Sequence, residues 1–202
     1  MLFPSILALV TVASAHGVVQ KPHPRTPGAE TSTACGKVLT DFYKADNTSY
    51  PEALVRSHPT FKPATSSCNP YLCRGYQFAD NTANVYSYKA GEKVDFSVYI
   101  RIPHVGNANV SVVDAKANKV IGEPLKSWPS GYADGKQFPN LPKDQTQFSV
   151  TIPDLSGKCA SPGDCVIQWY WFGQGQTYED CVDFTFGSAP ATSMRRGSRI
   201  AA

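Results

Sequence analysis

Hydrophobic and polar residues alternate from about residue 84 to residue 186, which predicts a series of short β-strands. In the first of them one face is apolar throughout, and it comprises Val94, Phe96, Val98, Ile100 and Ile102. A period of two is typical of a strand that buries one face. Similar runs follow at 109–113, 120–121, 148–152, 166–172 and 182–186, with a turn at 117–119. The dense aromatic run 166–172 predicts a strand buried on both faces.

Residues 17–82 differ, because they are rich in Pro, Ser, Thr and Asn and show little periodicity. They predict long loops with one short helix at most. Loops of this length are usually functional or held by disulfides. Short strands joined by turn-rich loops, without a convincing amphipathic helix, predict an all-β fold, an antiparallel β-sandwich of the immunoglobulin/fibronectin-like kind.

The first fifteen residues contain no charged side chain and end in Ala13-Ser14-Ala15. The small residues at both ends of that tripeptide are typical of a signal-peptide cleavage site. The alternative is a first strand or core segment, and the stretch is too short to span a bilayer, which takes about 20 apolar residues. We expect a signal peptide at 1–15, one domain at 16–187, and a disordered, polar tail at 188–202.

Six cysteines suit three disulfides in a secreted, extracellular protein, and they are Cys35, Cys68, Cys73, Cys159, Cys165 and Cys181. Cys159 and Cys165 flank a short Pro-Gly turn and are expected to pair with each other. The other four allow three pairings. Two sequons make Asn47 and Asn109 candidates for glycosylation.

The formal net charge is only +3, and no basic patch is interleaved with aromatic residues. This balance argues against a dedicated nucleic-acid binder. No second apolar stretch is long enough to anchor the chain in a membrane. We therefore expect no nucleic-acid or membrane partner. We also expect the protein to be a monomer.

Cleavage after Ala15 would make His16 the first residue, and this gives His16 an unusual chemistry. Its α-amine and ring Nδ1 can chelate one metal ion. The reference pKa of an α-amine is about 7.7–8.0, so a divalent metal can displace its proton near neutral pH. With one more imidazole nitrogen the donors would form a planar three-nitrogen site, which favours Cu(II).

Three other histidines could supply that third nitrogen. His104 directly follows a predicted strand, on a rigid rim where ligand geometry can be accurate. His23 and His58 each precede a proline in irregular segments and are weaker candidates. We therefore expect His104 to be the second metal ligand.

A third feature is the segment GQTYEDC at 175–181. In a strand Gln176 and Tyr178 share a face. The tyrosine could limit access to an open axis of the metal, and the glutamine could hydrogen-bond an oxygen species there. A plain core tyrosine beside a disulfide explains the pattern equally well.

Four segments together resemble fungal lytic polysaccharide monooxygenases: HGVVQKPHPR, CRGYQFADN, IRIPHVGNANVSVVD and CVIQWYWFGQGQTYEDCVDF. Within these enzymes the chain is most similar to the chitin-binding type-4 domain group that includes auxiliary activity family 16. The resemblance extends over residues 16–186, almost the whole predicted mature chain.

The resemblance implies one copper ion held by His16 and His104, with Tyr178 on its axis and Gln176 beside the oxygen co-substrate. In some fungal members the terminal histidine is methylated on its other ring nitrogen. The resemblance also favours two disulfides, Cys73–Cys181 and Cys35–Cys68.

The implied activity is oxidative cleavage of insoluble β-linked polysaccharide, with cellulose favoured over chitin, using O2 or H2O2 and an external electron donor. Tyr43, Tyr50, Trp128 and Tyr132 could flank the site, although packing residues are expected more often. The alternatives are a secreted copper-binding protein without oxidative activity and a metal-free polysaccharide-binding module. Hydrolysis is disfavoured, because no pair of carboxylates stands out in these segments.

Overall fold

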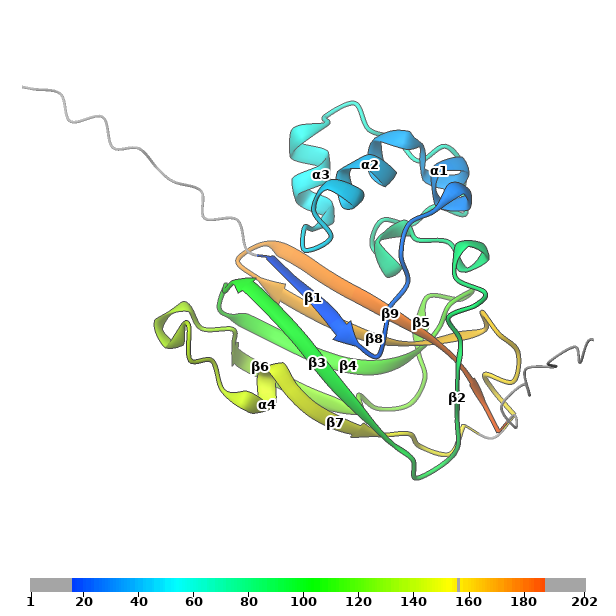
Figure 1. The fold of residues 1–202 in the computed structure, drawn as a ribbon, viewed down its shortest axis with the longest axis vertical. Coiled ribbons are helices and arrows are strands. Elements are labelled where there is room, and N and C mark those ends of the chain that lie inside the picture. The colour runs from blue at the N-terminus through cyan, green and yellow to red at the C-terminus, as the bar shows by residue number, and fades with distance from the viewer. Residues whose placement is uncertain (1–15, 156, 188–202) are drawn as a thin grey trace, which may run out of the picture.

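The computed structural model describes residues 16–155 and 157–187 (Figure 1). The expected signal peptide at 1–15 and the tail at 188–202 lie outside the described residues. The strands are β1 (His16–Lys21), β2 (Tyr86–Tyr88), β3 (Lys93–Ile102), β4 (Gly106–Asp114), β5 (Lys119–Val120), β6 (Lys126–Tyr132), β7 (Gln147–Thr151), β8 (Cys165–Gly173) and β9 (Gln176–Phe186).

The strands form two sheets that pack face to face. The smaller sheet has the order β1-β3-β7, and the larger has the order β2-β9-β8-β4-β5, with β6 also paired to β4. All pairs are antiparallel except β2 with β9. The predicted β-sandwich is therefore confirmed, with one parallel pair at the edge of the larger sheet.

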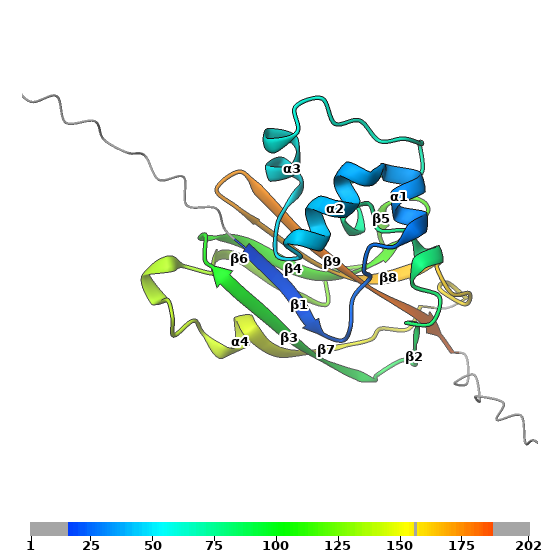
Figure 2. The same cartoon turned by 45° about the horizontal axis from the view of Figure 1, so that its top comes forward.

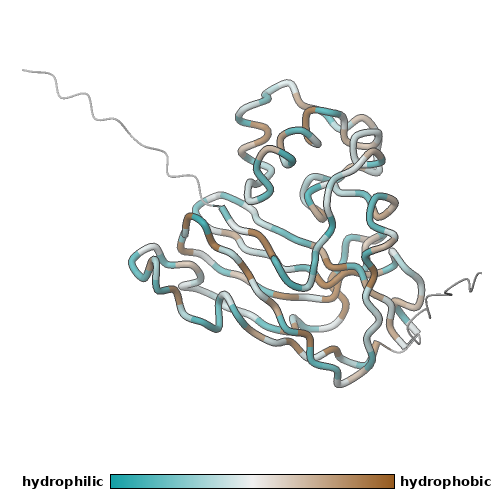
Figure 3. The backbone as a smooth tube through the Cα atoms, viewed as in Figure 1, coloured by the Kyte–Doolittle hydropathy of each residue, from teal (hydrophilic) through white to brown (hydrophobic). Residues whose placement is uncertain are grey.

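The core lies between the two sheets, where the alternating residues of the strands meet. Figure 3 shows the strands as alternating hydrophobic and hydrophilic stretches. Phe96 on β3 stacks against Phe148 on β7, with ring centroids 5.3 Å apart. Trp169 and Trp171 on β8 are fully buried, but Phe172 is 39% exposed. The expectation that β8 is buried on both faces is therefore wrong, because its second face is only partly covered.

Residues 17–82 differ from the sequence prediction, which expected long loops and at most one helix. They contain β1, the α-helices α1 (Ala29–Cys35), α2 (Lys37–Ala45) and α3 (Pro51–Ser57), and the 3₁₀ helices η1 (Cys73–Gly75) and η2 (Phe78–Asp80). We call residues 29–80 the helical segment. It lies over β1 and β9 at one side of the sandwich (Figure 2). Its own small core includes Leu39, Tyr43 and Leu54.

Two further short helices follow β6, namely η3 (Gly135–Gln137) and α4 (Lys143–Thr146). The strand β6 itself was missing from the sequence prediction. Among the described residues no helix is long and apolar enough to cross a membrane.

Three disulfides join Cys35 to Cys68, Cys73 to Cys181, and Cys159 to Cys165. The first two are the pairs that the resemblance favours, and the third is the pair expected from the short turn between Cys159 and Cys165. The first closes the helical segment on itself. The second ties η1 to β9 across 108 residues of sequence. The helical segment is therefore fixed to the strand that carries Gln176 and Tyr178.

Removing the long-range disulfide should destabilise the protein more than removing the short one. In the chain-entropy view, opening the 108-residue separation costs roughly 2–3 kcal/mol more than opening the 6-residue separation. The comparison is between the double variants Cys73→Ala/Cys181→Ala and Cys159→Ala/Cys165→Ala, measured by chemical denaturation. An equal or larger loss in the second variant would contradict this expectation.

Candidate metal centre

His16 lies at the start of β1, directly opposite the end of β3. Its pairing partner is Ile102, and the register shifts between His16 and Gly17. The residue is almost completely buried, with 8% exposed. The position of this first described residue is therefore set by the pairing of β1 with β3.

His104 lies two residues beyond Ile102, in the short connection between β3 and β4. The two histidines are therefore at the same end of the sandwich. The indole Nε1 of Trp171 donates a hydrogen bond of 3.2 Å to the backbone carbonyl of His104. His104 is 5% exposed, so its ring is held in a packed environment and not on a mobile loop.

Two glycines let the backbone of the His104 connection approach β8 closely. A Cβ on Gly173 would lie 2.6 Å from the carbonyl oxygen of His104, and a Cβ on Gly106 would lie 2.0 Å from the carbonyl oxygen of Phe172. Real side chains do not occupy such distances. The absence of side chains at both positions therefore fixes how near His104 sits to the β8–β9 hairpin.

A series of aromatic contacts leads from His16 to the backbone of His104. His16 makes an edge contact with Tyr50, with centroids 6.4 Å apart, and Tyr50 packs on Tyr178 at 5.1 Å. Tyr178 stacks on Trp171 at 4.3 Å, and Trp171 binds the His104 carbonyl. The structure thus brings His16, Tyr178 and the backbone of His104 into one continuous set of contacts.

Gln176 and Tyr178 share one face of β9, as the strand pattern predicts. The Tyr178 hydroxyl donates a hydrogen bond of 2.5 Å to Oε1 of Gln176. Burial, followed by the neighbouring Tyr50 and Glu52, raises the pKa of Tyr178 well above its ordinary value. The hydroxyl therefore stays protonated and keeps the Gln176 amide in one orientation.

Asp46, immediately after α2, contacts the His16 ring. Its Oδ2 lies 3.1 Å from Nε2 of His16 and 3.0 Å from Nη2 of Arg101, while Oδ1 accepts two hydrogen bonds from Thr48. Burial alone would raise the pKa of Asp46, but the hydrogen bonds from Thr48 and the charges of His16 and Arg101 lower it. A carboxylate on one ring nitrogen of a histidine commonly orients the other nitrogen for a metal.

The family described as "Lytic polysaccharide mono-oxygenase, cellulose-degrading" matches residues 16–184. The chain belongs to this family. The match starts at His16, the residue that the sequence singles out as a metal ligand. No curated protein sequence matches the chain.

Solved structures that resemble the chain include the following three. A chitin binding domain from Burkholderia pseudomallei has 15% identity and a TM-score of 0.43, over 85% of this chain and 99% of the other. The copper complex of the cellulose-active CelS2 has 16% identity and a TM-score of 0.39, over 86% and 100%. A cellulose-active polysaccharide monooxygenase from M. thermophila has 14% identity and a TM-score of 0.35, over 61% and 62%.

The other two histidines of the chain lie in different places. His23 is exposed beyond the far end of β1, where its backbone N–H donates to the hydroxyl of Tyr86. His58 caps the end of α3 and is exposed. Among the described residues no group of three His, Cys, Asp or Glu side chains is arranged to hold a metal. Two histidines and a terminal amine contain only two such side chains and do not form such a group.

The aromatic residues proposed to flank the site are buried. Tyr43, Tyr50 and Tyr132 are fully buried and Trp128 is 8% exposed, so they are packing residues and not a platform for substrate. Tyr50 contacts two candidate site residues, His16 and Tyr178.

The two sequons lie in contrasting environments. Asn47 is exposed in the turn after α2, next to Asp46. Asn109 lies within β4, which is paired on both sides, and its side-chain oxygen accepts a hydrogen bond from Ser111. Only Asn47 has the accessible turn conformation that suits a glycan acceptor.

Sequence reasoning missed three residues that support the site. Asp46 contacts His16. The carboxylate of Glu52 accepts hydrogen bonds from the N–H and hydroxyl of Thr177 on β9. Arg74 donates a hydrogen bond to the backbone carbonyl of Gly17. Their partners are far away in sequence, so no local pattern reveals them.

Behind Tyr178 the strand β9 contributes two buried carboxyl groups, Glu179 and Asp180. Burial outweighs the attraction of Arg74 and raises the pKa of Glu179 to about 8 and that of Asp180 to about 6. At neutral pH the cluster therefore holds a positive Arg74, a negative Asp180 and a largely protonated Glu179.

The pKa of Glu179 predicts a pH-dependent stability. Between its unfolded value near 4.5 and its folded value of about 8, the folded protein binds more protons, so stability falls as pH rises through this window. From pH 6.5 to 8.5 wild type should lose about 1 kcal/mol or more relative to Glu179→Gln, which keeps the volume and cannot ionise. Urea denaturation at each pH measures the difference.

Glu123→Gln is the matched control, because Glu123 is exposed. It should keep the wild-type pH profile. Parallel profiles for wild type and Glu179→Gln would show that Glu179 does not titrate in this range.

Proposed function

We propose that the chain is a secreted, copper-dependent polysaccharide monooxygenase whose metal is held by His16 and His104. The observation that carries this proposal is the placement of both histidines at one end of the sandwich, with Asp46 on Nε2 of His16. Nδ1 is the ring nitrogen that lies near enough to the α-amine of a histidine to chelate a metal with it, and Asp46 contacts the other ring nitrogen.

The donor set suits copper. After removal of residues 1–15, His16 would offer its α-amine and Nδ1, and His104 would offer a ring nitrogen. Three nitrogen donors in a plane favour Cu(II), which also leads the divalent affinity order. The Asp46 carboxylate would fix the ring of His16, and it occupies the nitrogen that is methylated in some fungal relatives.

The bound copper ion would supply the redox chemistry, activating O2 or H2O2 with electrons from an external donor to oxidise a sugar C–H bond at the glycosidic linkage. The protein contributes position and protection. The buried Tyr178 ring would close one side of the site to solvent. The Tyr178 hydroxyl donates to Oε1 of Gln176 and so orients the amide whose N–H groups would donate to the oxygen co-substrate.

We propose an insoluble β-linked polysaccharide as substrate, with cellulose favoured over chitin. The description of the matching family as cellulose-degrading supports this choice. The four segments quoted above support placing the chain near the fungal auxiliary activity family 16. We further propose that the protein acts as a monomer outside the cell, with Asn47 as its glycan site.

The variant His104→Ala should lose tight copper binding. Loss of an outer partner of a metal ligand typically costs about 10- to 100-fold in affinity, so loss of the ligand itself should cost about 100-fold or more. Competition titration of Cu(II) with a chelator measures the affinity, and circular dichroism checks the fold. His23→Ala is the control, because His23 is exposed at the far end of β1. An unchanged copper affinity in a folded His104→Ala variant would refute the assignment.

One extra glycine before His16 should abolish both tight copper binding and oxidative cleavage, because the terminal amine moves away from the imidazole. The two forms are incubated with a reductant and with cellulose, chitin, xylan or starch, and products are identified by mass spectrometry. We expect oxidised oligosaccharides from cellulose, and only with the form that starts at His16. Copper binding without products would instead favour a copper-binding protein without oxidative activity. Equal product formation by the extended form would contradict the role of the amine.

A further inference from the structure

Arg74 is a fully buried arginine in an unusual backbone conformation. Its side chain is 1% exposed. It lies in η1 between Cys73 and Gly75, and all three residues have positive φ, of 53°, 58° and 80°. Only glycine adopts this region readily, so two consecutive side-chain-bearing residues there require support from their surroundings. The disulfide from Cys73 to Cys181 provides a covalent part of that support.

The guanidinium of Arg74 binds three backbone carbonyls from three separate segments. Nε donates to Glu179 on β9 at 2.9 Å, Nη2 donates to Gly17 on β1 at 3.1 Å, and Nη1 donates to Asn47 in the turn after α2. These hydrogen bonds join parts of the chain that are otherwise far apart in sequence.

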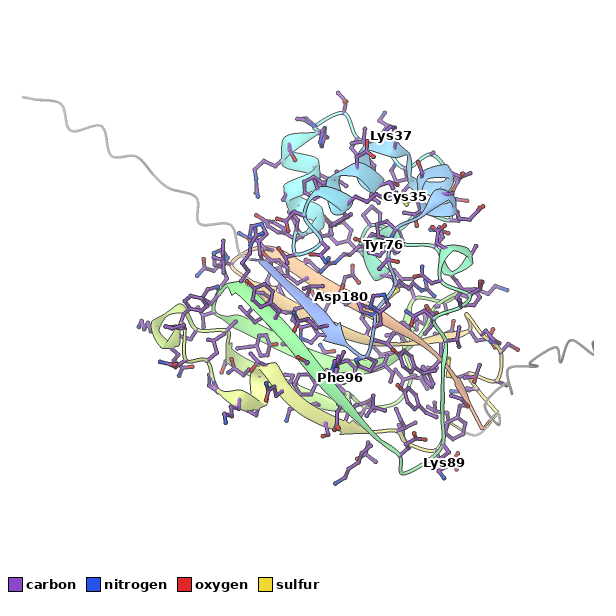
Figure 4. The ribbon with its side chains drawn as sticks, in the orientation of Figure 1. Cys35, Lys37, Tyr76, Lys89, Phe96 and Asp180 are labelled. Carbon is purple, nitrogen blue, oxygen red and sulfur yellow. A yellow bond between two sulfur atoms is a disulfide. The ribbon has the colours of Figure 1, made fainter. Side chains whose placement is uncertain are left out.

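Asp180 completes the arrangement from the opposite side. Its Oδ1 lies 3.3 Å from Nη2 of Arg74, and its Oδ2 accepts a hydrogen bond of 2.7 Å from the backbone N–H of Val19. The pair thus binds β1 at Gly17 and again at Val19. Figure 4 shows Asp180 beside β1, on the side that faces the helical segment.

Each carbonyl that Arg74 binds belongs to the neighbour of a residue in the proposed site. Gly17 follows His16, Asn47 follows Asp46, and Glu179 follows Tyr178. A single rigid group therefore connects the backbone next to His16, next to Asp46 and next to Tyr178.

We propose that Arg74 is a positioning residue, which holds the start of β1 against β9 and so sets where the amine and ring of His16 lie. This inference rests on the copper site proposed above. Arginine suits the task because its planar fork presents five donors in fixed directions, whereas the single ammonium of lysine cannot reproduce three diverging hydrogen bonds. Because Arg74 is fully buried, any carbonyl that lost its hydrogen bond from the guanidinium would stay unpaired, which would lower the free energy of unfolding.

A second buried arginine provides a matched control. Arg25 is 7% exposed and binds both carboxylate oxygens of Asp183, also on β9, at 2.7 Å, and it donates to the carbonyl of Tyr76. Neither acceptor belongs to a chain neighbour of His16, Asp46 or Tyr178. Arg25→Lys should therefore lose a comparable buried arginine–carboxylate pairing without disturbing the metal site.

The test compares wild type, Arg74→Lys and Arg25→Lys, all starting at His16. We expect Arg74→Lys to weaken Cu(II) binding by about 10- to 100-fold, the usual effect of outer-shell changes, and to alter the copper hyperfine coupling in electron paramagnetic resonance. In the metal-free protein, hydrogen exchange at the amides of Gly17 and Val19 should accelerate. Arg25→Lys should keep the copper affinity within about threefold and keep the wild-type spectrum.

The outcomes separate this inference from the proposed function. If wild type binds no copper, the proposed function fails, while the amide exchange of Gly17 and Val19 still tests the hold on β1. If wild type binds copper and the two variants behave alike, the positioning role of Arg74 is refuted.

If Arg74→Lys does not fold, the variant Asp180→Asn provides the test, because it removes the charge that pairs with Arg74 and keeps the side-chain volume. Asp180→Asn should weaken Cu(II) binding and alter the copper hyperfine coupling, as expected for Arg74→Lys. A wild-type affinity and a wild-type spectrum in this variant would overturn the inference.

Discussion

The pairing of β1 with β3 is the constraint on which the rest of the site depends. It sets His16 opposite Ile102, and the chain reaches His104 only two residues later. Without this pairing the two histidines would have no fixed relation, because 88 residues of sequence separate them. Backbone hydrogen bonds of a sheet edge thus determine the geometry of a candidate metal centre.

The surroundings of β1 reinforce that constraint in two ways. The disulfide from Cys73 to Cys181 fixes η1 to β9, and η1 in turn carries the Arg74 side chain that reaches β1. The buried charges are nearly balanced, because the raised pKa of Glu179 leaves Asp180 as the carboxylate that pairs with Arg74 at neutral pH. Balance of this kind limits the free-energy cost of burying a guanidinium.

Much of the sandwich could be predicted from the sequence, because each strand with one buried face shows the alternation directly. In β3 the residues Val94, Phe96 and Val98 are buried, as the pattern predicts. The helices α1, α2 and α3 could not be predicted in the same way. They span only 7, 9 and 7 residues, and their N-cap residues make no capping side-chain hydrogen bond, so tertiary packing and the Cys35–Cys68 disulfide stabilise them.

In the candidate site, too, local sequence patterns predict some residues and long-range contacts determine the others. His16, His104, Gln176 and Tyr178 could be proposed as candidates because each lies in a recognisable local motif. Asp46 and Arg74 could not, since their roles come from contacts across the fold. Arg74 reaches Gly17 over 57 positions and Glu179 over 105. Motifs therefore indicate the reacting groups, while only the fold shows what holds them in place.

The most direct measurement is a count of the nitrogen atoms that bind copper. Pulsed electron paramagnetic resonance of the protein starting at His16, with one equivalent of Cu(II), should show three directly coordinated nitrogens, one of which disappears from the ¹⁴N pattern when His16 carries a ¹⁵N α-amine. A spectrum with fewer than three, or one that is unaffected by the labelled amine, would contradict the proposed centre.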